Sequence, residues 1–227
     1  MAYALRRFAP LVLLAAVAGA ACQPVKPPPP PPPPGSFITY YLSDDSSGWV
    51  RSFLPHSRTL AGGATGSQQL LADGSVVLSL ANLAPATNGG SSFITVPLRL
   101  GDIQSIQLQL ASTCCEGVSV QLWFDINGDS DFFKWDSNGN GGFLGPDDAA
   151  SINTQASSLL IDDTTTLHVV NNMFTLGQIK AGTWKPTITP DTRVWILVRF
   201  GIFNPPPNNG SATVSALRVN GFDLLVP

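Results

Sequence analysis

Polar and apolar residues alternate one by one along much of this chain, and this period of two constrains the fold more than any other feature. In the run 106–110, Ile-Gln-Leu-Gln-Leu, the glutamines fall on one side and the aliphatic residues on the other. Successive side chains point to opposite faces in a strand. Strand-like runs recur at 75–80, 93–100, 118–124, 193–200 and 214–219, with Gly, Asn and Asp turns between several of them. We therefore expect an all-β domain, an antiparallel β-sandwich.

Composition agrees with this expectation. Charged residues make up 12% of the chain, and Glu116 is its one glutamate, so residues typical of solvent-exposed helices are scarce. One short helix is expected, at 176–181. In the run 193–200, four apolar residues share one face and should point into the core: Val194, Ile196, Val198 and Phe200.

The first 21 residues differ from the rest and read as a secretory signal peptide. Arg6 and Arg7 precede a short apolar stretch, Leu11 to Ala18, and small residues follow it. The stretch is too short for a membrane span. We expect an exported protein.

The junction Ala18-Gly-Ala-Ala-Cys22 resembles the lipobox of bacterial lipoproteins, with Gly19 where that family usually has Leu. The resemblance implies that Cys22 is acylated and anchors the chain to a membrane. Ordinary signal-peptidase cleavage after Ala20, giving a secreted protein, is the alternative.

Residues 22–35 are expected to form a linker, followed by one domain at 36–227. Pro27 to Pro34 is an unbroken proline run, which lacks backbone donors and adopts polyproline II. At about 3.1 Å per residue it spans roughly 25 Å. Such a segment suits a spacer that holds a domain off a surface. A ligand for a proline-binding domain is the competing interpretation.

The end of the chain resembles the closing strand of jelly-roll carbohydrate-binding modules. A long apolar strand, a Pro/Asn/Gly loop and a final strand carry the pattern V-x-x-x-x-V-x-G, with Val214, Val219 and Gly221 at its fixed positions. The resemblance covers about the last 35 residues. It implies a jelly-roll-like sandwich and an extracellular glycan as ligand.

The densest polar segment runs from Asp125 to Asp148 and suggests calcium. Oxygen ligands at alternate positions of a turning loop are what Ca²⁺ requires, and an EF-hand-type loop places them at positions 1, 3, 5 and 12. The predicted ligands are Asp125, Asn127, Asp129, Asp131 and Asp136. A polar loop whose Asp and Asn residues only form turns is the equally open alternative.

Two tryptophans in loop-like surroundings, Trp135 and Trp184, are the predicted glycan-stacking residues. The apolar C–H face of a sugar ring suits an aromatic surface. Packing in the core is the commoner fate of tryptophan. Trp123 and Trp195 lie within expected strands, and the sequence leaves open which way they face.

Cys114 and Cys115 are adjacent and form a candidate disulfide in an oxidising compartment. Two reduced thiols or an intermolecular bridge are the alternatives. The two histidines, His56 and His168, show no metal-ligand spacing.

Function is the least constrained part of the prediction. The net charge is −3 and no cluster of Lys and Arg stands out, so nucleic acid is not an expected partner. No catalytic motif stands out either, and a glycosidase pair would have to join Glu116 to an aspartate. We expect a non-catalytic binding domain, anchored to the cell envelope or secreted, for a glycan or envelope polymer. A structural envelope protein with protein partners and a secreted polysaccharide-acting enzyme are the alternatives.

Overall fold

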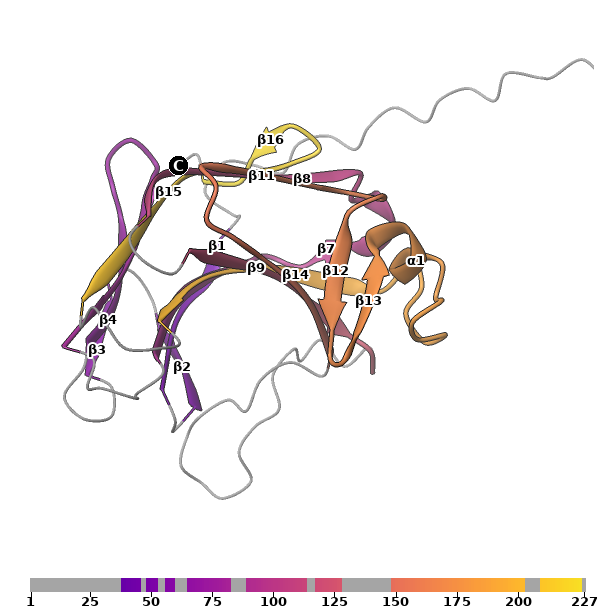
Figure 1. Cartoon of the computed structure of the whole chain (residues 1–227), viewed down its shortest axis with the longest axis horizontal. Helices are drawn as coiled ribbons and strands as arrows, with labels where there is room; N and C mark the ends of the chain where they lie inside the picture. The colour runs from indigo at the N-terminus through magenta and orange to yellow at the C-terminus, as the bar shows by residue number, and fades with distance from the viewer. Residues whose placement is uncertain are drawn as a thin grey trace, which may run out of the picture. The chain divides into compact units, whose positions relative to one another are not determined.

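The computed structural model shows two antiparallel sheets that pack face to face as a sandwich (Figure 1). The all-β fold class is therefore confirmed. The structure describes residues 38–45, 48–52, 56–59, 65–82, 89–113, 117–127, 148–202 and 209–225.

The larger sheet has nine strands and contains the centre of the candidate site. Its strands pair antiparallel, and β7 (Leu98–Arg99) pairs with β14 beside the main order. Across the sheet the order is β13 (Asn172–Thr175), β12 (Thr166–Val169), β10 (Asp148–Thr154), β9 (Val118–Asp125), β14 (Arg193–Ile202), β6 (Gly89–Thr95), β1 (Ile38–Asp45) and β2 (Gly48–Ser52).

The second sheet has seven strands, also antiparallel. β16 (Phe222–Asp223) pairs with β15 beside the main order. The order across the sheet is β11 (Ser158–Asp162), β8 (Ser105–Thr113), β15 (Gly210–Val219), β5 (Val76–Ala81), β4 (Thr65–Leu70) and β3 (His56–Thr59).

The core lies between the two sheets and follows the alternation seen in the sequence. On β8, Leu108 and Leu110 are buried while Gln107 and Gln109 are exposed. The predicted core face of β14 is confirmed, because all four of its apolar residues belong to the core cluster: Val194, Ile196, Val198 and Phe200. Burial of apolar area on this scale is the main source of stability for such a sandwich.

The expected strand over 93–100 is interrupted. β6 ends at Thr95, β7 covers Leu98–Arg99, and a 3₁₀ turn follows at Leu100–Asp102. Pro97 lies at the break, and proline has no N–H for a sheet ladder. The prediction was therefore wrong about continuity and right about the extended backbone on either side.

The expected helix is confirmed as α1 (Leu176–Lys180), which buries Leu176 and Ile179 in the core. Thr175 caps it: its hydroxyl accepts from the Gln178 amide at 3.1 Å, while the Gln178 side chain accepts from the Thr175 amide at 2.8 Å. Within the described part of the chain, no helix has the length and apolar character needed to cross a bilayer.

Candidate functional site

The middle of the nine-stranded sheet carries a second set of side chains, on the face opposite the core. Leu122 and Phe124 of β9 belong to the core cluster, so the residues between and beside them point the other way. β14 alternates in the same manner. Figure 1 shows β9 and β14 curving with this face on the concave side. We call it the concave face.

Directly opposite residues in an antiparallel pair share a face, so the register of β9 with β14 defines four rungs of the concave face. Trp123 and Trp195 form one rung and are 1% and 3% exposed, although neither belongs to the core cluster. Both tryptophans whose direction the sequence left open therefore lie buried on the concave face. The rungs are Asp125–Arg193, Trp123–Trp195, Gln121–Leu197 and Ser119–Arg199.

Hydrogen bonds connect the polar groups of this face along β9. The Trp123 indole Nε1–H donates to Gln121 Oε1 at 2.7 Å, and Gln121 Nε2 donates to Ser119 Oγ at 3.4 Å. A buried indole N–H usually finds such a partner. The bonds fix the orientation of the Gln121 amide and the Trp123 ring together.

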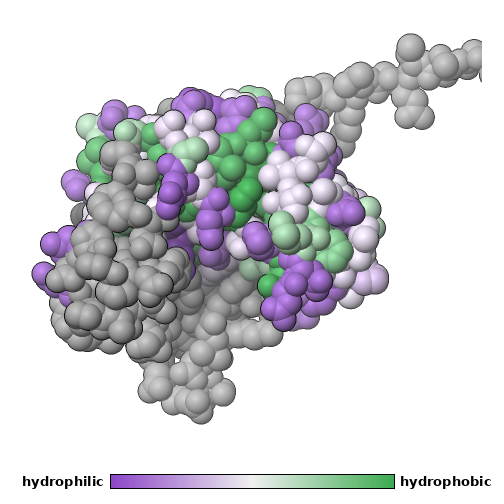
Figure 2. All heavy atoms as spheres, viewed as in Figure 1, coloured by the Kyte–Doolittle hydropathy of each residue, from purple (hydrophilic) through white to green (hydrophobic). Residues whose placement is uncertain are grey.

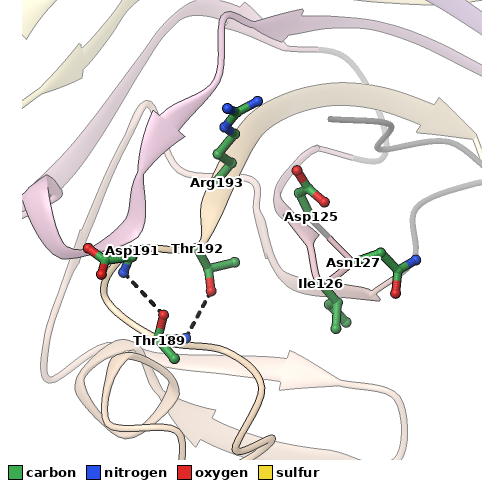
Figure 3. Close-up of a pocket in the computed structure, with 7 residues that line it drawn as sticks. All are labelled: Asp125, Ile126, Asn127, Thr189, Asp191, Thr192 and Arg193. Carbon is green, nitrogen blue, oxygen red and sulfur yellow. Dashed lines mark hydrogen bonds between the residues drawn. The ribbon is translucent and has the colours of Figure 1, made fainter. Parts of the chain in front are cut away.

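A pocket of about 340 Å³ opens at the Asp125–Arg193 end of the concave face (Figure 3). One wall is the end of β9 and the residues after it. The other wall is the segment that leads into β14. The lining residues are Asp125, Ile126, Asn127, Thr189, Asp191, Thr192 and Arg193.

The wall before β14 is a closed turn. The Thr189 amide donates to Thr192 Oγ1 at 2.9 Å, and the Thr192 amide donates back to the Thr189 carbonyl at 3.0 Å. The Asp191 amide bonds Thr189 Oγ1 at 3.3 Å (Figure 3). Because the hydroxyls organise the turn, its shape does not depend on a ligand.

Contacts with other elements hold the same segment in place. The Leu100 amide donates to the Thr192 carbonyl at 3.0 Å, and the Gly101 amide donates to the Pro190 carbonyl at 2.8 Å. A Cβ on Gly101 would come within 2.8 Å of Pro190 Cβ, so glycine allows this close approach. These contacts give the pocket a preformed wall.

One ion pair joins the pocket wall to β7, and a second one holds the segment that precedes the wall. Arg99 pairs with Asp191, and Lys185 pairs with Asp148 at the start of β10. The first pair is largely exposed, and exposed pairs contribute little stability. Their main effect here is to direct the two carboxylates.

The pocket combines acceptors and donors of several kinds: carboxylates, an amide, hydroxyls and a guanidinium. Such a mixture suits a ligand that carries many hydroxyl groups, each of which both donates and accepts. A glycosidase would instead need two carboxyl groups facing each other across the bond that it cleaves. Figure 3 shows the Asp191 carboxylate directed away from Asp125. Asp125 and Asp191 therefore do not form a facing pair.

Two of the predicted calcium ligands lie together. Asp125, which is buried, and Asn127, which is exposed, both line the pocket. The other three, Asp129, Asp131 and Asp136, lie outside the described residues. Among the residues that the structure does describe, no three His, Cys, Asp or Glu side chains form a group that could hold a metal. The calcium site stays a prediction.

Trp184 is half-buried and packs against the core. Its ring meets Phe124 edge-on, with centroids 5.8 Å apart and an interplanar angle of 71°. It precedes the Thr189–Arg193 wall in the chain and does not line the pocket. Its stacking role stays a prediction.

The remaining predicted site residues lie outside the described residues. They are the second stacking residue, Trp135, the acylation site, Cys22, and the candidate disulfide, Cys114 and Cys115.

Sequence reasoning missed the second wall of the pocket, from Thr189 to Arg193. Thr189-Pro-Asp-Thr192 has the residue types of a turn, which was a usable local signal. The turn could not reveal that the end of β9 forms the opposite wall, because β9 and β14 pair across some 70 residues of chain. The arginines at both ends of the run 193–199, on the face opposite the apolar residues, were a second signal.

No protein-family model matches the chain, and no curated protein sequence matches it. Among solved structures, it is similar to a thermostable cellulase derived from Cel12A of Rhodothermus marinus. The likeness covers 79% of this chain and 99% of that one, at 10% identity and a TM-score of 0.30. A likeness at this level carries no argument about function, so the function rests on the site itself.

Proposed function

We propose that the domain binds an extracellular carbohydrate without chemically changing it, and that the pocket beside Asp125 and Arg193 is where the sugar binds. The observation that carries the proposal is the composition of the pocket. A preformed wall from Thr189 to Thr192 faces Asp125 and Asn127, and together they offer hydrogen-bond donors and acceptors in a space of about 340 Å³. Small-ligand sites are concave and largely preformed, with a few placed polar groups.

The rival function, docking of a protein partner through a sheet edge, has weaker support. Figure 2 shows an apolar patch in the region of β11, the strand that carries Leu160, which is 51% exposed. β11 is an edge strand of the second sheet. However, the Asp162 amide bonds Thr165 Oγ1 at 3.0 Å and its carbonyl accepts from the Thr165 amide at 3.0 Å. The end of that edge is thus already occupied.

The chain is proposed to act outside the cytoplasm. The segment 1–21 would direct export, Cys22 would be acylated, and the proline run would hold the domain away from the membrane. An acyl mass on Cys22 of the purified native protein is the expected result. An N-terminus at Ala21, or an unmodified Cys22, would contradict the anchor and leave a secreted protein.

Calcium is proposed to order the segment that begins at Asp125. Asp125 and Asn127 supply oxygen donors of the kind that Ca²⁺ takes, and they lie beside the proposed sugar pocket. Calcium would then shape one wall of the pocket while the Thr189–Thr192 turn shapes the other.

A glycan array probed with the purified chain tests the carbohydrate proposal. We expect binding to one class of polysaccharide, and we expect Asn127→Ala to weaken it because an exposed amide of the pocket lining is lost. Asn172→Ala is the matched control: Asn172 is also exposed, but it lies on β13 and does not line the pocket. A chain that binds no glycan, or equal effects of the two variants, would contradict the proposal.

A further inference from the structure

The hairpin of β12 and β13 forms one edge of the nine-stranded sheet (Figure 1). Its register sets His168 directly opposite Met173. Both residues are exposed, Met173 to 58%. Of the two methionines in the chain, Met1 lies in the expected signal peptide, so Met173 is the sole methionine of the rest. An exposed thioether therefore stands opposite one of the two imidazoles of the chain.

The turn of the hairpin fixes this arrangement, which no ligand motif in the sequence reveals. Val169 and Asn172 form the closing pair, and a two-residue loop joins them. In such a hairpin the next pair is of the non-hydrogen-bonded kind, whose side chains lie closer together, with Cβ atoms about 4.5–5.5 Å apart. Val170 in the loop has a φ of 49°, which a β-branched residue rarely adopts. The tight loop thus holds the histidine and the methionine as direct neighbours.

Both side chains point away from the core. Leu167 and Val169 flank His168 along β12 and belong to the core cluster, so His168 lies on the other face of the sheet. Met173 shares that face, because directly opposite residues do so. Within the described part of the chain, neither side chain forms a hydrogen bond or an ion pair. The imidazole nitrogens and the thioether sulfur are therefore accessible to a ligand.

The chemistry of the pair selects a soft cation. Calcium and magnesium take oxygen ligands, and structural zinc sites have four ligands, mostly Cys and His. Residues 166–175 of the hairpin contain no Asp, Glu or Cys. A thioether favours monovalent copper, and imidazole is a common copper ligand. Two neutral ligands also match a monovalent ion, because the hairpin has no carboxylate to offset a second charge.

We propose that His168 and Met173 form a binding site for monovalent copper. Zinc bonds to imidazole nitrogen and to sulfur are about 2.0–2.3 Å long, and copper bonds are of similar length, so the two atoms must come to about 4 Å of each other. Directly opposite side chains of this length meet that requirement. Binding forms two coordinate bonds and transfers no electron. The site is independent of the proposed carbohydrate function, since neither residue lines the pocket.

Silver ions test the site in air, because Ag⁺ shares the charge of monovalent copper and its preference for soft ligands. The purified chain would be labelled with ¹³C at the methionine methyl group and titrated with silver nitrate in chloride-free buffer. We expect the NMR signal of the Met173 methyl group to shift and to saturate at one equivalent. Calcium and zinc at the same concentration should leave the signal unchanged.

Copper itself is measured without oxygen, by competition with a coloured chelator of monovalent copper. We expect His168→Gln and Met173→Leu each to lower the affinity for copper by at least about tenfold, since each removes one of two ligands. Both variants should keep the wild-type melting temperature without metal, because the two residues are exposed. His56→Gln is the matched control: His56 lies on β3 of the second sheet, and its loss should leave the affinity unchanged.

A Met173 methyl signal that does not move at one equivalent of Ag⁺ would overturn the site. Unchanged copper affinity in His168→Gln, or an equal loss in His56→Gln, would overturn it as well. If zinc shifts the signal as silver does, the assignment to a soft monovalent ion is wrong.

Discussion

Asn220 connects two segments of the chain through one side chain, its own turn and residues 102–105. Its Oδ1 accepts from the amides of Gln104 and Ser105 at 2.7 and 3.1 Å, and its Nδ2 donates to the Asp102 carbonyl at 2.6 Å. Its φ is 52°, and Gly221 follows with a φ of 84°. Positive φ at both central residues is the geometry of a tight hairpin turn that suits Asn-Gly.

We expect Asn220→Ala to lower the free energy of unfolding by about 2 kcal/mol, from the lost hydrogen bonds and the positive φ that alanine disfavours. Urea denaturation measures this. Asn220→Gly keeps the backbone conformation and should cost less than Asn220→Ala. If both variants were as stable as the wild type, the side chain would have no structural role.

Asp162 illustrates how a local turn changes an ionisable group. The Thr164 hydroxyl and then the Thr164 amide, at 2.7 and 2.9 Å, hold the pKa of the Asp162 carboxyl below its ordinary value, and Thr165 adds to the effect. Since the pKa is lower in the folded state, the bonds stabilise the fold above about pH 4. That contribution is lost as pH falls through the folded-state pKa.

Thr164→Val should therefore raise the pKa of Asp162, measured by NMR titration of its carboxyl carbon. The difference in stability between the variant and the wild type should be largest near neutral pH and shrink in acid. Asp73, whose pKa is lowered by its own bonds to Ser75, should titrate unchanged. A shift in both carboxyls would point to a global change instead.

At the scale of elements, the strands that alternate strictly were the most predictable. The run 106–110 became part of β8 and the run 193–200 became part of β14, because one buried face fixes the phase of each. The V-x-x-x-x-V-x-G pattern also has a local reason, since Val219 pairs with Phe222 around the Asn220-Gly221 turn. Local rules were sufficient for these features.

Features that depend on pairing between distant strands could not be predicted. The direction of Trp123 depends on which face of β9 the second sheet covers, and the pocket depends on β14 joining β9. Nothing within either strand specifies its partner.

The short helix α1 depends on its cap. A five-residue helix is marginal alone, so the reciprocal bonds between Thr175 and Gln178 stabilise its start. We expect Thr175→Ala to cost about 1 kcal/mol in chemical denaturation. Thr175→Ser retains the hydroxyl and should recover most of the loss. Equal losses in the two variants would assign the effect to the methyl group and not to the cap.

At the scale of the whole molecule, calcium is expected to stabilise the fold. A ligand that binds the folded state alone adds about 2.7 kcal/mol at a hundredfold excess over Kd. EDTA should therefore lower the melting temperature, and Ca²⁺ should restore it better than Mg²⁺, which prefers strict octahedral geometry. Asp129→Ala should abolish the response. If neither Ca²⁺ nor EDTA changes the melting temperature, the calcium site is wrong and the segment is only a polar loop of turn residues.

On the proposed function, the two faces of the nine-stranded sheet have different tasks. One face of the nine-stranded sheet closes the core with the second sheet, while its concave face carries tryptophans, arginines and the polar pocket. The proposed binding pocket therefore lies on the face opposite the core. Substitutions on the core face should affect folding, and substitutions at the pocket should affect the ligand.

Amide hydrogen exchange with and without a bound glycan tests this account most directly. The account predicts added protection at the end of β9, in the Thr189–Thr192 turn and along β14, with little change in β4 and β5 of the second sheet. Protection centred on the second sheet, or no change while the glycan is bound, would contradict the concave face as the binding surface.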